Sequence, residues 1–406
     1  MKPEERPIQN ILDELVHGDP VSRRHMLGRV GAAGVTLAGL PAFLSACGGV
    51  EGTSTTSSTA AQAAAAAVDH PKVPIGDWTF TNWPLYIDKK VLKSFNKEFG
   101  GKVKYVEEIN DNFEFFGKVR QQLSSGRPID RDIVVLTDYM AARWLRDGYV
   151  EAIDKKNVPN MSNLVDNLQT INYDPNRDFT LPWQSGAIGL GYDISKTGRE
   201  ITSVKDLFDP KFKGRVSMLA EPYDSANTVL LGDGVDASKA TLDQILGAID
   251  KIDEANQAGQ FRRFTGNDYT TDLTKGNVWI ALAYSGDLIQ LQSDNPDLRF
   301  AYPEEGAMLF TDNMMIPKDA AHPYAAETMM NYVYDPEVQA KITEFVNYIP
   351  PVIGVQELLE KSDPELAKNE LIFPPEEVRK KLFAYPQLSS GDERKMQEAM
   401  AKVTGA

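Results

Sequence analysis

The sequence is poor in cysteine and histidine. It contains one cysteine, Cys47, and four histidines, of which only His322 lies beyond residue 70. A single cysteine excludes an intramolecular disulfide framework and any multi-cysteine zinc or iron–sulfur site. The shortage of histidine leaves almost no material for a histidine-based catalytic triad or a multi-histidine metal centre. We therefore expect neither a metal nor another cofactor.

Basic side chains are outnumbered by acidic ones. The chain has 43 Lys and Arg against 58 Asp and Glu, a net charge of -15. A surface of this sign disfavours nucleic acid and anionic membranes as partners, and it suits a cationic ligand. The 406 residues are 42% hydrophobic and 25% charged, which excludes disorder throughout. The length suggests two or three domains.

The first segment has the order of an export signal. The basic pair Arg23-Arg24 precedes the weakly apolar run 28–44, which leads to Leu44-Ser45-Ala46-Cys47. This order resembles a twin-arginine signal joined to a lipoprotein box, although Met26 replaces the usual Phe. We predict that residues 1–46 are a removable signal segment.

Two other interpretations of this region remain. The apolar run could be a transmembrane helix, but Arg29 and Pro41 interrupt it. Cys47 could be a small buried thiol. Its position directly after Leu-Ser-Ala favours diacylglycerol attachment, so we expect Cys47 to become a lipid-anchored amino terminus. Residues 47–72, rich in Ser, Thr, Gly and Ala, then form a flexible linker that holds an acidic body near the outer face of the membrane.

From residue 77 onward, strand patterns alternate with helical ones, which predicts an α/β fold with largely parallel sheets. Strands are expected at 77–82, 102–108, 132–136, 215–219, 277–283 and 298–303. Helices are expected at 88–99, 112–124, 139–148, 203–208, 226–232, 238–256, from 287, at 320–346, and near 355, 376 and 391. The order restarts after LPWQSGAIGLGYD, at 181–193, and the chain crosses back at AMLFTDNMMIP, at 307–317. The sequence therefore predicts two α/β units.

Aromatic and acidic side chains recur just past the predicted strands. They are Trp83, Tyr86, Thr137, Tyr139, Glu221, Asp224, Tyr284 and Asp287. In open α/β sheets, ligands bind at the carboxyl ends of the strands. Rings can cover the methylenes of a diamine and contact its ammonium groups, while carboxylates supply the opposite charge. Ordinary roles are also available, because aromatic rings pack cores and acids cap first helical turns.

At this point the chain resembles the periplasmic spermidine/putrescine-binding proteins of bacterial ABC importers. The resemblance runs from about Ile75 to the carboxyl terminus, through TFTNWPLYID, DIVVLTDYM, LPWQSGAIGLGYD, DLFDPKFKGRVSML, YPEEGAMLFTDNMMIP and FVNYIPP. It implies a two-lobed periplasmic-binding-protein fold of type II, with lobes joined by a hinge. It places lobe 1 at 73–186 and 312–350, and lobe 2 at 187–311 and 351–406.

The resemblance also implies roles for individual residues. It puts Trp83 and Tyr86 in an aromatic wall, Thr137 and Tyr139 in the opposite loop, and Glu221 and Asp224 against ligand ammonium groups. Asp287 and Asp312 match acids that bind a terminal amine, Phe310 matches an aromatic of spermidine binders, and Tyr348 lines the cleft near a hinge crossing. Two positions depart from the family: Tyr284 replaces a frequent tryptophan, and Gly266 replaces a polar contact.

These observations predict an extracytoplasmic, monomeric lipoprotein that captures putrescine or spermidine and delivers it to an ABC permease, without a catalytic step. A solute-binding protein for an amino-acid derivative, a sugar or another organic cation is an alternative. A glycosidase using Glu221 and Asp224 is a further one, but the mature part shows no nucleophile elbow, P-loop or GxGxxG motif. A purely structural surface lipoprotein would leave the clustered aromatics unexplained.

Overall fold

The computed structural model describes residues 68–405. The predicted signal segment 1–46, the predicted lipid-attachment residue Cys47 and most of the predicted linker 47–72 lie outside the described residues. No helix within the described part of the chain is long and apolar enough to cross a membrane.

Strands and helices alternate through the first part of the described chain. The elements up to the middle are β1 (Asp77–Asn82), α3 (Lys89–Phe99), β2 (Lys102–Glu107), α4 (Asn112–Ser124), β3 (Ile133–Thr137), α5 (Asp138–Arg146), β4 (Thr180–Asp193), α6 (Ile194–Thr197), β5 (Val216–Leu219), α7 (Pro222–Gly232), α8 (Leu242–Gln257) and β6 (Phe261–Thr265). The predicted α/β class is thus the observed one.

The remaining elements complete both halves of the molecule. They are α9 (Tyr269–Thr274), β7 (Ile280–Tyr284), α10 (Ser285–Leu291), β8 (Leu298–Ala301), β9 (Ala307–Met315), α11 (Pro323–Val333), α12 (Pro336–Val346), α13 (Val355–Ser362), α14 (Glu376–Arg379), β10 (Leu382–Phe383) and α15 (Ser390–Thr404). The segment expected to form a helix at 203–208 is a short 3-10 helix, Val204–Phe208.

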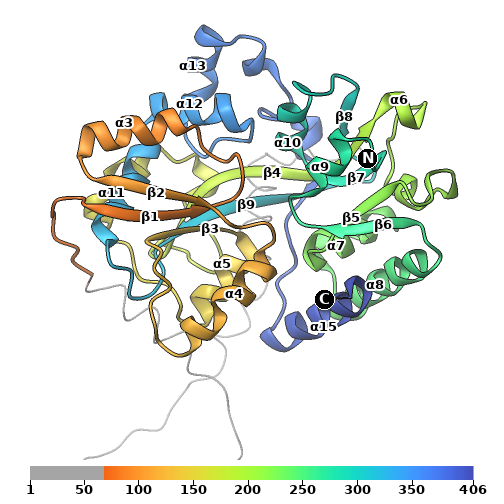
Figure 1. The fold of residues 1–406 in the computed structure, drawn as a ribbon, viewed down its shortest axis with the longest axis horizontal. Coiled ribbons are helices and arrows are strands. Elements are labelled where there is room, and N and C mark those ends of the chain that lie inside the picture. Colours follow the sequence, from red (N-terminus) through yellow and green to blue (C-terminus); the bar gives the residue numbers. More distant parts are fainter. Residues whose placement is uncertain (1–67, 406) are drawn as a thin grey trace, which may run out of the picture.

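Two lobes lie side by side and share the long strands β4 and β9 (Figure 1). The strand order is β2-β1-β3-β9-β4-β7-β5-β6, with β8 paired to β4 and β10 to β9. We call the part built on β1, β2 and β3 the first lobe, and the part built on β5, β6 and β7 the second lobe. Because β4 and β9 continue from one lobe into the other, they connect the two at the centre of the molecule.

The expectation of largely parallel sheets is only partly right. The outer strands of each lobe are parallel, since β1 pairs with β2 and β3, and β5 pairs with β6 and β7. The central pairs β3–β9, β4–β9, β4–β7 and β4–β8 are antiparallel. The physical reason is the crossing itself: β4 carries the chain into the second lobe and β9 carries it back, so the two run in opposite directions.

Local sequence signals explain where the elements begin and end. The Asp88 side chain caps α3 by accepting a hydrogen bond from the Lys90 backbone N–H at 2.8 Å. The helix buries Val91, Leu92 and Phe95, and it ends at Gly100, whose φ of 76° favours glycine. The apolar run of β3 is buried along its whole length, as expected for a strand covered on both faces.

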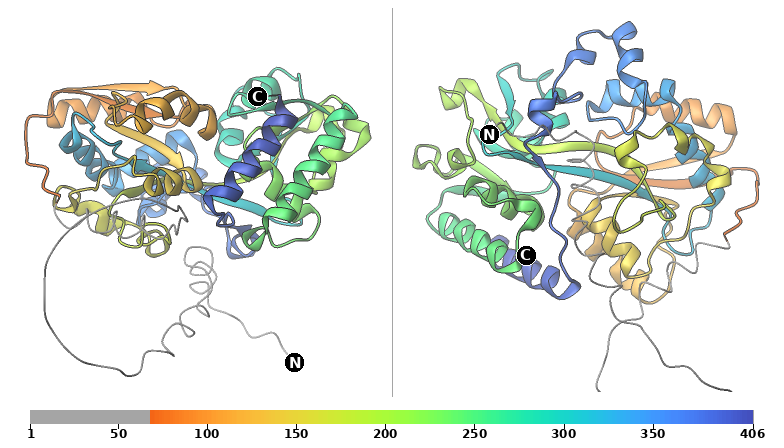
Figure 2. Two further views of the ribbon diagram at one scale, coloured as in Figure 1. Left: turned by 90° about the horizontal axis from the view of Figure 1, so that it is seen from below. Right: turned by 180° about the vertical axis from the view of Figure 1, so that it is seen from behind.

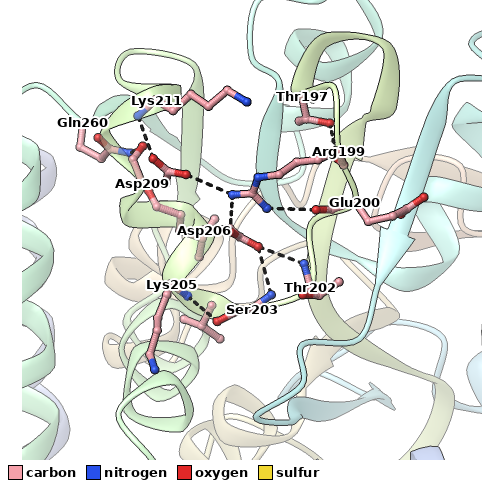
Figure 3. Close-up of polar contacts among 12 residues, drawn as sticks. Thr197, Arg199, Glu200, Thr202, Ser203, Lys205, Asp206, Asp209, Lys211 and Gln260 are labelled. Atoms are coloured by element: carbon pink, nitrogen blue, oxygen red, sulfur yellow. Dashed lines mark hydrogen bonds and ion pairs between the residues drawn. The ribbon is translucent and has the colours of Figure 1, made fainter.

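Arg199 holds together the segment that leads from β4 to β5. Its guanidinium contacts the carboxylates of Asp206 at 2.7 Å and Asp209 at 3.1 Å (Figure 3). Asp206 also accepts the backbone N–H groups of Thr202 and Ser203. Burial raises the pKa of Asp206, but these hydrogen bonds outweigh it and leave the pKa below its ordinary value. The segment is thereby fixed just before β5, whose end carries candidate site residues.

The C-terminal segment passes between the lobes at the back of the molecule before it reaches α15 (Figure 2). Helix α13 packs on α12 of the first lobe, and α15 packs on α8 of the second. Between them, β10 pairs with β9. The chain therefore connects the two lobes a third time, and residues near β10 lie close to the centre of the molecule.

The amino-terminal end of the described chain is attached to the first lobe. The Nδ1 atom of His70 lies 2.6 Å from Oε1 of Glu327, a fully buried carboxylate of α11. The Asn157 side-chain amide donates to the His70 carbonyl oxygen and to Glu327. The last residues of the predicted linker are thus bonded to the body.

Candidate functional site

A small cavity lies between the two lobes, at the carboxyl ends of their parallel strands. Its volume is about 30 Å³, and it is lined by Trp83, Pro84, Tyr86, Thr137, Asp224, Asn267, Tyr284, Asp287, Phe310, Asp312, Tyr348 and Tyr385. These lining residues, all in the described part of the chain, include no lysine, arginine or histidine. Nine of the eleven ligand-binding residues expected from the sequence therefore surround one cavity.

Asp312 lies within β9 and is buried against the first lobe. Its carboxylate accepts the Tyr86 hydroxyl at 2.8 Å and the Thr137 hydroxyl at 2.8 Å. Burial raises the pKa of Asp312 to about 7, although both hydrogen bonds oppose the shift. The donors come from two different strand ends, so the carboxylate is held in place from the β1 side and from the β3 side.

Asp287 lies in the first turn of α10, next to the end of β7. One oxygen accepts the Asn267 amide and the Tyr269 hydroxyl, both at 2.7 Å, and the other accepts the Tyr348 hydroxyl at 2.7 Å. Burial raises its pKa, and the three donors work in the opposite direction. Because Tyr348 follows α12 of the first lobe, this carboxylate also joins the two lobes.

Asp224 lies in the first turn of α7, directly after β5. Its two oxygens accept the hydroxyls of Tyr284 at 3.0 Å and Tyr385 at 2.7 Å. Burial raises the pKa of Asp224 to about 7. Three carboxylates thus face one small space, each bonded by neutral donors and none by a cationic side chain.

A row of aromatic rings forms the wall between these acids. Tyr86 contacts Tyr348 edge-on at 5.2 Å between ring centroids, Tyr348 contacts Phe310 at 6.0 Å, and Phe310 contacts Tyr284 at 5.4 Å. The Trp83 indole N–H donates to the Val135 carbonyl at 3.1 Å, which orients the ring over the cavity's first-lobe side. Such rings present apolar faces that are also attractive to cations.

The structure does not bring Glu221 and Tyr139 to the cavity. Glu221 is fully buried and accepts the Asn112 backbone N–H at 2.5 Å, the Asn112 amide at 2.8 Å and the Tyr139 hydroxyl. Burial, followed by the nearby acids Asp111 and Asp224, raises the pKa of Glu221. In this arrangement a carboxylate of the second lobe bonds the amino end of α4 in the first lobe, so the pair connects the lobes.

Sequence reasoning missed four polar side chains at or beside the site. Asn267 and Tyr269 follow β6, a strand that the sequence analysis did not assign, and the strand-end rule would have found them had it been assigned. At Asn112 the sequence pattern indicates only the start of a helix, although this residue also follows β2. Tyr385 had no local signal, because it reaches the cavity through the C-terminal crossing.

The glycine at position 266 has a structural reason. A Cβ atom added there would lie 2.2 Å from the carbonyl oxygen of Asn110 in the first lobe. The neighbouring backbone N–H of Asn267 donates to that same oxygen at 2.9 Å. Gly266 therefore permits the close approach of the two lobes at this point.

We expect Gly266→Ala to weaken lobe closure and ligand affinity together. The added methyl group overpacks the contact with Asn110. This overpacking should weaken binding by about 1 to 3 kcal/mol, which is about 5- to 150-fold in Kd. Small-angle scattering should show a larger radius of gyration with saturating ligand than the parent protein has. Gly247→Ala is the matched control, since nothing lies within 4 Å of its added Cβ. Equal compaction and affinity in both variants would contradict the role of Gly266.

Comparison with known proteins identifies the family. A model of the family described as bacterial extracellular solute-binding protein matches residues 90–374. A putrescine-binding periplasmic protein of Pseudomonas aeruginosa is 28% identical over 341 residues, covering 79% of this chain and 90% of that protein. A spermidine/putrescine-binding periplasmic protein of Escherichia coli is 24% identical over 303 residues, covering 74% and 84%.

The fold comparison agrees with the expected architecture. A solved structure from Listeria monocytogenes, described as a putative spermidine/putrescine ABC transporter, superimposes with a TM-score of 0.72 at 24% identity. It covers 81% of this chain and 98% of the other. The predicted two-lobed, type II periplasmic-binding-protein fold is confirmed. With its family model matched over most of the body, this chain belongs to the bacterial extracellular solute-binding proteins.

Proposed function

We propose that the protein captures a polyamine, putrescine or spermidine, in the cavity between its lobes. The observation that carries this proposal is the set of three carboxylates, Asp224, Asp287 and Asp312, around an aromatic-walled cavity whose lining residues include no basic side chain. A buried acid needs a cationic partner to remain charged at moderate cost. A protonated aliphatic amine supplies that charge at each end, and its methylenes suit the rings.

The relatives support the same ligand class. The P. aeruginosa protein is named for putrescine binding and the E. coli protein for spermidine and putrescine binding. Since the acids and rings expected from that resemblance surround one cavity here, ligand class and site geometry support each other. The protein acts by capture, with no chemical step on the ligand.

Binding requires the lobes to separate and then to close around the ligand, with a wider cavity than the ligand-free structure has. A cavity of about 30 Å³ has room for a water molecule or two and not for an extended diamine. The proposed lobes are 73–186 with 312–350, and 187–311 with 351–406. The packing of α15 on α8 supports assigning the carboxyl end to lobe 2. A ligand that contacts both lobes favours the closed form.

The proposal extends to location and partners. The protein works outside the cytoplasm, as a monomer, after export by the twin-arginine route and lipid attachment at Cys47. The closed form docks on the permease of an ABC importer. The order of basic pair, apolar run and Leu-Ser-Ala-Cys supports export and anchoring, and the names of the relatives as periplasmic proteins support the compartment.

A thermal-shift panel tests the proposed ligand. A ligand at 100 times its dissociation constant adds about 2.7 kcal/mol to the free energy of unfolding. Putrescine and spermidine are expected to raise the melting temperature. A hexose, which has no ammonium group, and glutamate, which has only one, are expected to leave it unchanged. If the hexose or glutamate raises the melting temperature and neither polyamine does, the proposed ligand class is wrong, whereas the family assignment still holds.

A further inference from the structure

A second and much larger cavity lies behind the proposed ligand site. Its volume is about 1170 Å³, and its walls come from the loop 165–179, the hinge region 349–357 and the C-terminal segment 372–388. In the view from behind, the C-terminal segment runs between the lobes in this region (Figure 2). The small and the large cavity are neighbours, because both are lined by this crossing segment.

Tyr385 is the one described residue that lines both cavities. Its hydroxyl donates to Asp224 Oδ1 at 2.7 Å on the side of the ligand site. Its ring packs edge-on against Tyr139 at 5.1 Å and Tyr223 at 5.8 Å, and these two rings line the large cavity. Tyr139 and Tyr223 stack on each other at 4.4 Å, so the partition is an aromatic cluster with Tyr385 at its inner edge.

We propose that Tyr385 is a specificity-determining partition at the Asp224 end of the ligand site: it excludes polyamines with a bulky substituent on the nitrogen bound there. The inference rests on the proposed function. A secondary ammonium keeps its positive charge and two of the three N–H donors of a primary one, so charge alone does not distinguish the two. The distinction is steric, because a substituent has to pass Tyr385 to reach the large cavity.

The chemistry of the partition defines the ligand class that its removal admits. The stacked rings of Tyr139 and Tyr223 line the large cavity just beyond Tyr385, and 1170 Å³ exceeds the space that an aryl group needs. The admitted ligands are N-aryl-methyl polyamines, such as N-benzylputrescine. In these molecules the diamine occupies the acid-lined site and the apolar group occupies the large cavity.

The test separates the ring of Tyr385 from its hydroxyl. Tyr385→Phe keeps the ring and loses the hydrogen bond to Asp224, and Tyr385→Ala loses both. Dissociation constants for putrescine and N-benzylputrescine are measured by calorimetry for the parent protein and both variants. The quantity compared is the ratio of the two constants in each protein, because a loss of the hydrogen bond alone affects both ligands alike.

The parent protein and Tyr385→Phe are expected to prefer putrescine over N-benzylputrescine by about 100-fold or more, on the scale of steric discrimination in closed sites. In Tyr385→Ala this preference should fall at least about tenfold, because burial of the aryl group in the large cavity then strengthens the binding of N-benzylputrescine. If the alanine variant does not fold, Tyr385→Leu, which also removes the aromatic ring, takes its place in the test.

The three negative outcomes have different meanings. If the parent protein binds neither putrescine nor spermidine, the proposed function is overturned and the partition with it. If the parent binds putrescine and the preference is the same in the phenylalanine, alanine and leucine variants, the partition alone is overturned. If the parent binds N-benzylputrescine as tightly as putrescine, Tyr385 does not exclude the substituent and the inference is wrong.

Discussion

Replacing Asp312 with asparagine is expected to weaken polyamine binding by about 2 to 5 kcal/mol, or about 30- to 5,000-fold in Kd. The variant keeps the size of the side chain, and the amide can still bond the hydroxyls of Tyr86 and Thr137. It removes the negative charge, so a desolvated ammonium loses its ionic partner. Asp287→Asn should act in the same way at the other lobe. Calorimetric titration with putrescine and spermidine measures both effects.

Two controls separate the loss of charge from a general disturbance. Tyr86→Phe removes one neutral hydrogen bond to Asp312 and leaves the charge of Asp312 in place. The binding free energy is therefore expected to weaken by only about 0.5 to 1.5 kcal/mol. Asp335→Asn changes the cap of α12, whose carboxylate bonds the backbone of its own helix and does not line the cavity. Its affinity should equal that of the parent. Unchanged affinity in both Asp312→Asn and Asp287→Asn would remove these acids from the binding site.

Polyamine affinity is expected to rise with pH between 6 and 8. Burial raises the pKa of Asp224 and of Asp312 to about 7 in the protein without a ligand. An ammonium group favours the charged carboxylate, so binding at pH 6 has to displace a proton from each acid. The expected change is about tenfold in Kd per acid over these two pH units, or about 100-fold for both.

The same shifts predict how ligand-free stability depends on pH. An acid whose pKa is raised on folding favours the protonated form, so its contribution to stability is fully present below its unfolded pKa, near 4. That contribution is lost as the pH rises toward 7. Because putrescine also binds more tightly at high pH, the increase in melting temperature that it causes should be larger at pH 8 than at pH 5.

Proton release gives an independent measurement. Calorimetry in two buffers of different ionisation enthalpy should report about two protons released per putrescine at pH 6, and about one in Asp312→Asn. A dissociation constant that is the same at pH 6 and pH 8, together with no proton release, would show that the two acids are already charged in the free protein.

Local pattern alone predicted most of the elements that position the site. The alternation of apolar runs and caps placed β1, β3, β5 and β7 within a few residues, because strand and helix periodicities are properties of short segments. The rule that ligands bind past strand ends then selected Trp83, Thr137, Asp224 and Asp287. All four line the same cavity.

Contacts made by the crossing segments depended on the tertiary structure. The residue pattern of β4 and β9 does not show that they run antiparallel through both lobes. Nor does it show that Glu221 bonds Asn112 across the gap instead of lining the cavity. Tyr385 lies 161 positions from Asp224, the residue that it bonds. No periodicity extends over such a distance, so only the path of the chain between the lobes decided which side chains meet.

The sequence by itself thus determined the α/β class, the acidic and aromatic character of the site and most of its members, because these follow from composition and from signals a few residues long. The tertiary structure decided which acids face the cavity, which ones join the lobes, and where the cavity ends. These features arise from side chains that are distant in the sequence and are brought together by the three connections between the lobes.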